Sequence, residues 1–305
     1  MIYTVTLNPA VDYYISMDKF VEGKLNLSKD GYTLAGGKGI NVSKVLKNCG
    51  VDSVALGFVG GFTGDYIKSD LKDSNIAENF IELKENTRIN IKIKTEINES
   101  EIAGKSPNIT QESVNNFFNI ISKIKDGDIL ILSGRVPNSL SADIYAQIIE
   151  KLPQGVAVIL DARGEAFKLA LEKGVYLVKP NKHELEEFFN EKYNSIDEII
   201  EAGKKLRDLG SENVIISMGK EGSILITSHG EFIGNVPQGE LVSSVGAGDS
   251  MVAGTLYGLV NGISIYEAYK YGIAAGSATA FKSGLANLED IKKLLKGIEV
   301  IKRFC

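Results

Sequence analysis

Four consecutive residues, Gly246-Ala247-Gly248-Asp249, combine a possible anion-binding turn with a carboxylate. Backbone N–H groups in a glycine-rich turn, together with the positive end of a following helix dipole, bind a phosphate or a developing anion. Residues 250–260 are mostly small or apolar, so we expect a buried helix to begin at this turn. Asp249 then has two interpretations: it accepts a proton from an attacking hydroxyl group, or it only caps the helix and complements its dipole.

A second glycine-rich segment, Gly36-Gly37-Lys38-Gly39-Ile40-Asn41, precedes a predicted amphipathic helix that ends at Gly50. It is not a Walker loop, because Tyr32 stands where a glycine is required and Gly39 follows the lysine. The dinucleotide-binding fingerprint is also absent after the first strand, which argues against a dehydrogenase. The segment is suited to bind a sugar or a phosphate, and a glycine turn with a solvated lysine is the alternative.

The segment Asn181-Lys182-His183-Glu184 follows an apolar strand and Pro180. Asn181 and Glu184 have the spacing of a capping box, in which each side chain binds the backbone N–H of the other residue. The same spacing can direct both side chains toward bound phosphates, with Glu184 holding Mg²⁺ directly or through water. The sequence leaves both interpretations open.

Three isolated basic residues, Lys24, Arg88 and Lys179, lie beside predicted edges of sheets. A single Lys or Arg is usually solvated, so each matters only if the fold brings it to the site. His183 and His229 are expected to be surface histidines, and a chain with only two histidines is a poor candidate for a zinc site.

The composition bounds the class of protein. A chain of 305 residues with 44% hydrophobic residues can bury a large core, and no linker divides it, so we expect one domain over residues 1–305. The net charge of −5 argues against non-specific binding to nucleic acid. Cys49 and Cys305 suggest no disulfide framework. Residues 1–7 resemble a strand rather than a signal sequence, and no apolar run could span a membrane, so we expect a cytoplasmic protein.

Three alternating stretches stand apart from the main pattern. Residues 13–20 and 25–33 precede any helix, and residues 88–96 follow the first β/α unit. Alternation of apolar and polar side chains is typical of half-exposed strands. We expect these stretches to form a small β lid, from about residues 12–34 and 87–104.

The rest of the chain alternates strands with helices. Strands are expected at 1–7, 53–59, 128–132, 156–160, 175–178 and 213–217, with a hairpin at 223–236. Helices are expected at 65–73, 110–124, 140–151, 164–172, 182–189, 195–209, 264–282 and 287–296, besides those after the two glycine-rich segments. The continuously apolar strands at 129–132 and 156–160 indicate a parallel sheet covered on both faces. Right-handed crossovers then place the active site at the carboxyl edge of the sheet.

Together these segments resemble the PfkB family of ribokinase-like carbohydrate kinases, whose signatures are an early Gly-Gly-x-Gly-x-Asn and a late Gly-Ala-Gly-Asp. The resemblance spans nearly the whole chain. Within the family, residues 4–13, 36–41, 87–90, 95–98 and 245–250 are most similar to members that phosphorylate fructose 1-phosphate, and next to those that act on tagatose 6-phosphate. The resemblance implies a three-layer α/β/α sandwich with a mostly parallel sheet and a small β lid. It also implies ATP, Mg²⁺, a sugar-phosphate acceptor and a homodimer built through the lids, without a nucleic-acid or membrane partner.

The resemblance assigns roles by position. Asp249 becomes the base, and the amides of Gly246, Ala247 and Gly248 stabilise the transferring phosphoryl group. The substrate-binding positions are Asp12, Lys24, Gly36, Gly37, Lys38, Asn41, Arg88 and Ser133. The ATP-binding positions are Lys179, Asn181, Ser217, Gly219, Gly222 and Gly248. Glu184 falls at the metal position.

Two residues depart from the family pattern, since Arg135 and Arg163 stand where relatives usually have a small side chain. Arg135 either adds a contact to a phosphate or points to solvent. A catalytically silent sugar-phosphate sensor of the same fold is the alternative of a different class. The intact Gly246–Asp249 motif argues against it, because a sensor has no need of the base.

Overall fold

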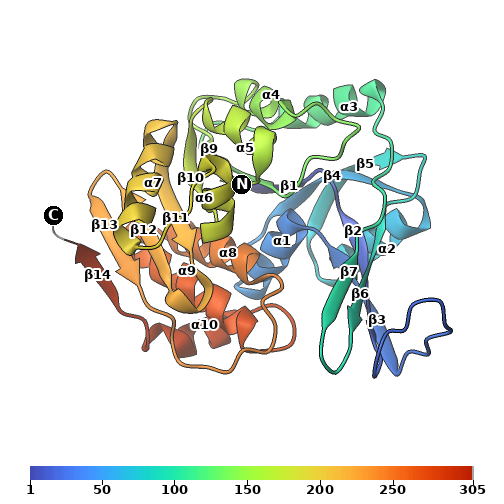
Figure 1. Cartoon of the computed structure of the whole chain (residues 1–305). Coiled ribbons are helices and arrows are strands. Elements are labelled where there is room, and N and C mark those ends of the chain that lie inside the picture. The colour runs from blue at the N-terminus through green and yellow to red at the C-terminus, as the bar shows by residue number, and fades with distance from the viewer. Residues whose placement is uncertain (304–305) are drawn as a thin grey trace.

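The apolar strands of the sequence form the centre of a ten-stranded sheet in the computed structural model, which describes residues 1–303 (Figure 1). Across the sheet the strands are β14 (Val300–Arg303), β13 (Gly230–Gly234), β12 (Ser223–Thr227), β11 (Ser211–Ser217), β10 (Val175–Val178), β9 (Ala157–Asp161), β8 (Ile129–Ser133), β1 (Ile2–Thr6), β4 (Val54–Gly60) and β5 (Ala77–Leu83). The strands from β11 to β5 pair in parallel, whereas β12, β13 and β14 add antiparallel pairs at one edge. All carboxyl ends of the parallel strands therefore meet at one edge.

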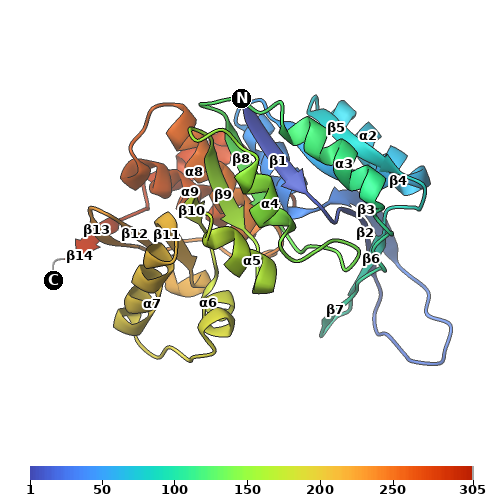
Figure 2. The same ribbon diagram turned by 90° about the horizontal axis from the view of Figure 1, so that it is seen from above.

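Helices cover both faces of this sheet, which gives three layers (Figure 2). One face carries α3 (Gln111–Ile121), α4 (Ile144–Glu150), α5 (Gly164–Leu171), α6 (Lys182–Phe189) and α7 (Ile196–Asp208). The other face carries α1 (Lys38–Asn48), α2 (Gly61–Asp73), α8 (Ala247–Val260), α9 (Ile265–Ala280) and α10 (Leu288–Leu295). A short 3₁₀ turn, Gly219–Glu221, joins β11 to β12. The three-layer α/β/α prediction is confirmed.

A second, four-stranded sheet stands beside the sandwich, with the order β3-β2-β6-β7. Its strands are β2 (Ala10–Ser16), β3 (Asp30–Gly36), β6 (Ile89–Lys94) and β7 (Glu99–Ile102). Both connections leave the carboxyl edge of the large sheet, because β2 follows β1 and β6 follows β5. The small sheet therefore stands over the edge where the site was expected.

The strand expected at 25–33 begins only at Asp30. Before it, the side chain of Asn26 closes a turn: its Oδ1 accepts from Val21 N at 2.8 Å, and its Nδ2 donates to the carbonyl oxygens of Val21 and Lys24. Asn side chains compete with strand pairing in this way. Alternation alone did not reveal the turn.

Two strands, β5 and β14, were not expected from the sequence. Both lie at edges of the large sheet. Edge strands are half exposed and carry charged side chains, so they lack the apolar run that marks the central strands. In residues 1–303, no helix combines the length and the apolar character needed to cross a membrane.

Candidate active site

The turn before α8 has the backbone that the glycine motif predicted. Gly246 is the N-cap of α8 with φ of 78°, a conformation that favours glycine, and a Cβ there would lie 2.8 Å from Leu285 Cδ2. The first-turn amides of α8 have no partner four residues earlier in the helix. The amide of Ala247 has a long hydrogen bond to Ser244 O at 3.3 Å. The turn thus presents N–H groups and the positive end of α8 to the carboxyl edge of the sheet.

Asp249 lies in the first turn of α8 and is 6% exposed. It does not cap the helix, because the N-cap is Gly246 and no side chain makes the cap hydrogen bond. Instead, Asp249 Oδ2 accepts a hydrogen bond of 2.7 Å from Asn41 Nδ2. Asn41 belongs to α1, so this contact joins the two glycine-rich motifs.

A second buried carboxylate, Asp161, ends β9 and is 2% exposed. Its Oδ1 lies 3.0 Å from Lys38 Nζ and 3.6 Å from Lys179 Nζ. The ammonium of Lys179 also approaches the α8 turn, since a Cβ on Gly248 would lie 3.2 Å from its Nζ. Two lysines are therefore held by one carboxylate, and Lys179 lies beside the turn that begins α8.

The two buried aspartates have opposite pKa shifts. Burial and repulsion by Asp161 raise the pKa of Asp249 to about 6, although Lys38, Asn41 and Lys179 act in the other direction. Burial also opposes ionisation of Asp161, but attraction to Lys179 and Lys38 outweighs it and lowers the pKa of that carboxyl. A carboxylate with a pKa near neutrality is suited to proton transfer, whereas Asp161, whose pKa is lowered by two lysines, is suited to hold cations.

The capping box of α6 is present. Asn181 Oδ1 accepts from Glu184 N, and Glu184 Oε2 accepts from Asn181 N, both at 2.9 Å. The other oxygen, Glu184 Oε1, lies 3.9 Å from Lys38 Nζ. Glu184 therefore combines a structural role with a second oxygen at the site.

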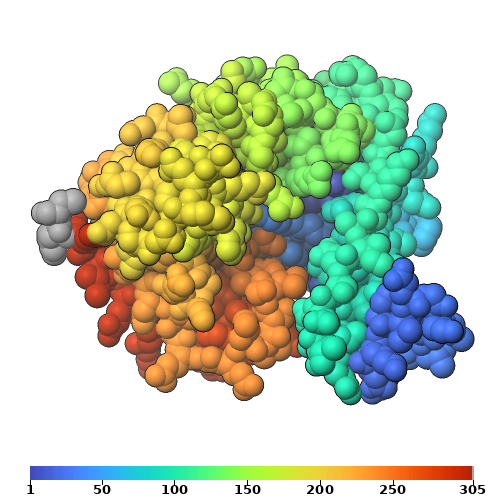
Figure 3. Space-filling view, viewed as in Figure 1, coloured from blue at the N-terminus to red at the C-terminus, as the bar shows by residue number. Residues whose placement is uncertain are grey.

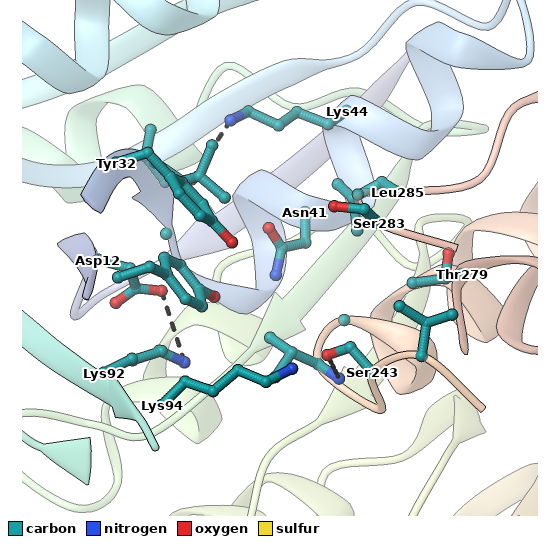
Figure 4. Close-up of a pocket in the computed structure, with 18 of the residues that line it drawn as sticks. Asp12, Tyr32, Asn41, Lys44, Lys92, Lys94, Ser243, Thr279, Ser283 and Leu285 are labelled. Carbon is teal, nitrogen blue, oxygen red and sulfur yellow. Dashed lines mark hydrogen bonds and ion pairs between the residues drawn. The ribbon is translucent and has the colours of Figure 1, made fainter. Parts of the chain in front are cut away.

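A cavity of about 680 Å³ separates the small sheet from the start of α8 (Figure 3). Figure 4 shows Asp12 and Lys92 of the small sheet on one side of it, Thr279 on the other, and Asn41 between them. Asp12 accepts a hydrogen bond from Asn90 Nδ2 at 2.8 Å and lies 3.8 Å from Lys92 Nζ. Burial raises the pKa of Asp12, and Lys92, Asn90 and Arg88 partly offset this effect. Polar groups thus line a space large enough for a sugar phosphate.

The glycine segment before α1 is confined by its neighbours. A Cβ on Gly36 would lie 2.5 Å from Asp12 Oδ2, and one on Gly37, where φ is 136°, would lie 2.6 Å from Thr6 Cγ2. Only glycine allows the small sheet, β1 and α1 to meet so closely.

The turn that contains Ser217, Gly219 and Gly222 lies beside α6. Ser217 N donates to Pro180 O at 3.1 Å, and Ser217 forms an isolated bridge with Asn181. Gly219 and Gly222 have φ of 59° and 92°. The residues assigned to ATP by the resemblance are therefore next to one another at the same edge of the sheet.

Three predicted substrate-binding residues lie in three different places: an exposed loop, the base of the small sheet and the buried end of β8. Lys24 is exposed in the loop between β2 and β3 and does not line the 680 Å³ cavity. Arg88 donates to the carbonyl oxygens of Asn8 and Pro9 and to Asn90 Oδ1, so it already supports the base of the small sheet. Ser133 is buried at the end of β8.

Sequence reasoning did not select Asp161, Asn90 or Lys92. Asp161 had a signal, because it ends a continuously apolar strand whose carboxyl end was expected at the site. Asn90 and Lys92 belong to the polar half of an alternating strand, which the alternation marks only as half exposed. In the structure Lys92 lines the cavity, and Asn90 donates a hydrogen bond to Asp12, which also lines it.

The sequence and the fold of the chain are similar to those of known proteins. The model of the family described as "pfkB family carbohydrate kinase" matches residues 5–292. A 1-phosphofructokinase of Bacillus subtilis is 46% identical over 303 residues, which cover 99% of this chain and 100% of the relative. A tagatose-6-phosphate kinase of Staphylococcus epidermidis is 34% identical over 309 residues, with 99% and 100% covered. The crystal structure of phosphofructokinase-2 from Escherichia coli has a TM-score of 0.91 and 29% identity, with 97% and 98% covered.

Proposed function

Because the chain belongs to the pfkB family of carbohydrate kinases, we propose that it is an ATP-dependent 1-phosphofructokinase. It transfers the γ-phosphoryl group of ATP to the 6-hydroxyl of fructose 1-phosphate and releases fructose 1,6-bisphosphate and ADP. The observation that carries this proposal is the buried Asp249, held by Asn41 beside the amides that begin α8.

The proposed mechanism gives each group one task. The Asp249 carboxylate accepts the proton of the attacking hydroxyl group while that oxygen bonds to phosphorus and the ADP oxygen leaves. The amides of Gly246, Ala247 and Gly248 stabilise negative charge on the transferring group, and Lys179 adds a cation beside them. Such transfer needs little covalent chemistry from the protein, so positioning supplies most of the acceleration.

The acceptor is proposed to lie in the 680 Å³ cavity, with its hydroxyl groups on Asp12, Asn41 and the backbone of Gly36, which line the cavity, and on the adjacent backbone of Gly37. We favour fructose 1-phosphate over tagatose 6-phosphate as the acceptor, because the 1-phosphofructokinase of Bacillus subtilis is more similar to this chain than the tagatose-6-phosphate kinase is. Lys38 and Arg88 remain proposed contacts of the phosphate on the acceptor. Lys24 would reach that phosphate only if its loop moved, or if it contacted the acceptor bound to another subunit.

ATP is proposed to bind along Ser217, Gly219, Gly222, Asn181 and Lys179. Mg²⁺ prefers octahedral oxygen coordination and is commonly held by one or two carboxylates together with substrate phosphates. Residues 1–303 gather no group of three acidic, His or Cys side chains, so the protein's share would be Glu184 Oε1, directly or through water. Bound there, the metal would neutralise charge on the phosphates of ATP.

We also propose a cytoplasmic homodimer built through the small sheets. On the face of this sheet away from the cavity, Tyr13, Ile91 and Ile102 pair across three strands, and Tyr13 and Ile102 are 38% and 53% exposed. Ile89 adds a further exposed apolar side chain on β6. An apolar row on a solvent-facing sheet is a common feature of an interface.

ADP formation with ATP and Mg²⁺ tests the proposed function, by comparing kcat/KM for fructose 1-phosphate, fructose 6-phosphate, tagatose 6-phosphate and unphosphorylated fructose. We expect the highest value for fructose 1-phosphate. A preference for tagatose 6-phosphate would keep the mechanism and replace the acceptor. Binding of sugar phosphates without turnover would instead support the sensor alternative.

A further inference from the structure

The cavity-facing side of the small sheet carries a row of side chains to which the proposed mechanism gives no task. Tyr32 of β3 is opposite Tyr14 of β2, and Tyr14 is opposite Lys92 of β6. Lys92 is in turn opposite Glu101 of β7. All four residues line the 680 Å³ cavity. Because side chains on one face of a sheet contact their cross-strand neighbours, each member of this row restrains the next.

Lys92 has a fixed place within the row. Its Nζ lies 5.4 Å from the centre of the Tyr14 ring, and that ring is stacked on Tyr32 with the ring centres 4.8 Å apart. A cation over the face of an aromatic ring is attracted by the quadrupole of the ring. The side chain of Lys92 is only 20% exposed. The ammonium group is therefore held against the wall of the cavity.

Two carboxylates lie at nearly equal distances from this ammonium group. Asp12 Oδ2 is 3.8 Å from Lys92 Nζ, and Glu101 Oε1 is 3.9 Å from it (Figure 4). The side chain of Glu101 is 53% exposed on an edge strand, whereas that of Asp12 is 15% exposed. Solvent screens the exposed pair more than the covered pair, so the charge of Lys92 acts mainly on Asp12.

The two oxygens of Asp12 have different neighbours. Oδ1 accepts the hydrogen bond from Asn90 Nδ2 at 2.8 Å. Asn90 is itself fixed, because its Oδ1 accepts from Arg88 Nη1 at 3.2 Å and from Gly104 N at 3.1 Å. The distance of 3.8 Å between Oδ2 and Lys92 is too long for a hydrogen bond, so the lysine attracts the carboxylate without occupying its lone pairs. Asn90 thus orients the carboxylate, and Lys92 balances its charge.

The charged and titratable groups around Asp12 act in both directions. Burial has the largest effect and raises the pKa of Asp12, and the negative charge of Glu101 adds to it. Lys92 has the largest effect that lowers this pKa, followed by the amide hydrogen bond and by Arg88. Burial and the charge of Asp12 raise the pKa of Tyr14, so this phenol stays neutral. Lys92 is therefore the neighbour whose loss most favours the protonated form of Asp12.

We propose that Lys92 is a positioning residue, which keeps the Asp12 carboxylate charged and available to the hydroxyl groups of the acceptor. This inference rests on the proposed function, in which Asp12 binds those hydroxyl groups, and extends it to a lysine outside both glycine-rich motifs. A carboxylate only accepts hydrogen bonds, whereas a protonated carboxyl group uses one oxygen as a donor. Hydrogen bonds to a charged acceptor are also the stronger ones. The acceptor therefore binds more tightly when Asp12 is ionised.

Lys92→Met is the test, because it retains most of the side chain and removes the charge. The measurement is the dissociation constant of fructose 1-phosphate without ATP, by isothermal titration calorimetry from pH 5 to pH 8. We expect the acid limb of this profile to move up by about one pH unit, because Asp12 loses a nearby cation. The dissociation constant should then rise about 10-fold at pH 5 and much less at pH 8, where Asp12 is ionised in both proteins. Lys92→Arg keeps the charge and should restore most of the binding at pH 5.

Lys94→Met is the matched control. Lys94 lies two residues farther along β6 and lines the same cavity, but its ion-pair partner is Glu99, at 3.7 Å, rather than Asp12. Its removal should leave the pH profile of binding at the wild-type position. A second control adds Lys92→Met to Asp12→Asn. Because Lys92 acts through the charge of Asp12, the double variant should bind no more weakly than Asp12→Asn alone.

Three results would overturn the inference: an unmoved pH profile in Lys92→Met, the same movement in Lys94→Met, or a further loss when Lys92→Met is added to Asp12→Asn. Failure of the proposed function is distinguishable. If the wild-type protein acts on another ketose, phosphorylated or not, the acceptor is wrong and Lys92 is judged by the dissociation constant of that ketose. If the wild-type protein binds no ketose, both the proposed function and the role of Lys92 are wrong.

Discussion

At the scale of single residues, Asp249 carries the proposed chemistry. Asp249→Asn keeps the size of the side chain and its contact with Asn41 but removes the base. We expect kcat to fall about 10²- to 10⁴-fold while ATP still binds. Steady-state kinetics together with ATP titration measure both effects, and wild-type turnover in this variant would remove Asp249 from the mechanism.

The same substitution has a predictable effect on stability. The pKa of Asp249 is raised in the folded protein from 3.8 to about 6, so the folded state binds more protons than the unfolded chain between these values. Stability contributed by this group is therefore lost as the pH rises through that window. We expect Asp249→Asn to melt at a higher temperature than wild type at pH 7, with the difference shrinking toward pH 4. A lower melting temperature at pH 7 would contradict the raised pKa.

Activity should depend on pH through the same group. Because the ionised form of Asp249 is the proposed base, kcat should rise as the pH increases through about 6 and then level off. Lys38 lowers the pKa of Asp249, so Lys38→Met should move this acid limb to higher pH. The pH profiles of kcat for both proteins provide the measurement, and an unmoved limb would mean that another group sets it.

The local sequence around each residue determines whether it could be identified as a site residue from the sequence. Asp249, Asn41 and Lys38 lie in glycine-rich motifs at helix starts, where spacing alone indicates an anion site. Asp161 and Asn90 depend on partners 123 and 78 positions away, Lys38 and Asp12, which no local pattern reveals. Lys24 shows the converse, because it was predicted to bind the substrate but lies in an exposed loop that does not line the cavity.

At the scale of secondary-structure elements, a substitution at the N-terminus of α6 can distinguish two roles of Glu184, helix capping and metal binding. Glu184→Gln retains an acceptor for Asn181 N, so the helix should remain capped and the melting temperature unchanged. Loss of the negative charge should raise the Mg²⁺ concentration for half-maximal activity about 10-fold.

The matched control lies in the capping box of α7, where Glu198 accepts from Ser195 N in the same arrangement. Glu198→Gln should leave the Mg²⁺ dependence unchanged. Equal Mg²⁺ curves for all three proteins would show that Glu184 only caps its helix.

Central elements could be predicted and edge elements could not. The strands β8 and β9 are buried on both faces, so their apolar runs are unmistakable. In β5, the first three residues, Ala77–Asn79, are exposed and only Phe80 and Leu83 are buried, and β14 has four residues. Their pairing partners, rather than their composition, determine that they are strands.

At the scale of the whole molecule, the outer face of the small sheet tests the proposed dimer. Ile102→Glu places a charge at the end of the apolar row that lies on the edge strand β7 and should dissociate the dimer, as measured by sedimentation velocity. Ile196→Glu is the control, since Ile196 is 43% exposed at the start of α7, far in sequence from the small sheet. A wild-type monomer, or a dimer that persists in Ile102→Glu, would contradict this interface.

The hydrogen bond between Asn41 and Asp249 joins residues that are 208 positions apart. A ribosome adds about 5–20 residues per second, so Asn41 waits about 10–40 s for its partner to be synthesised. During that time the emerging chain has the segments that are proposed to bind the sugar but lacks the proposed base. We therefore expect the chain to consume no ATP until nearly all of it has been translated. A fragment released by incomplete translation would be inactive and would not consume ATP.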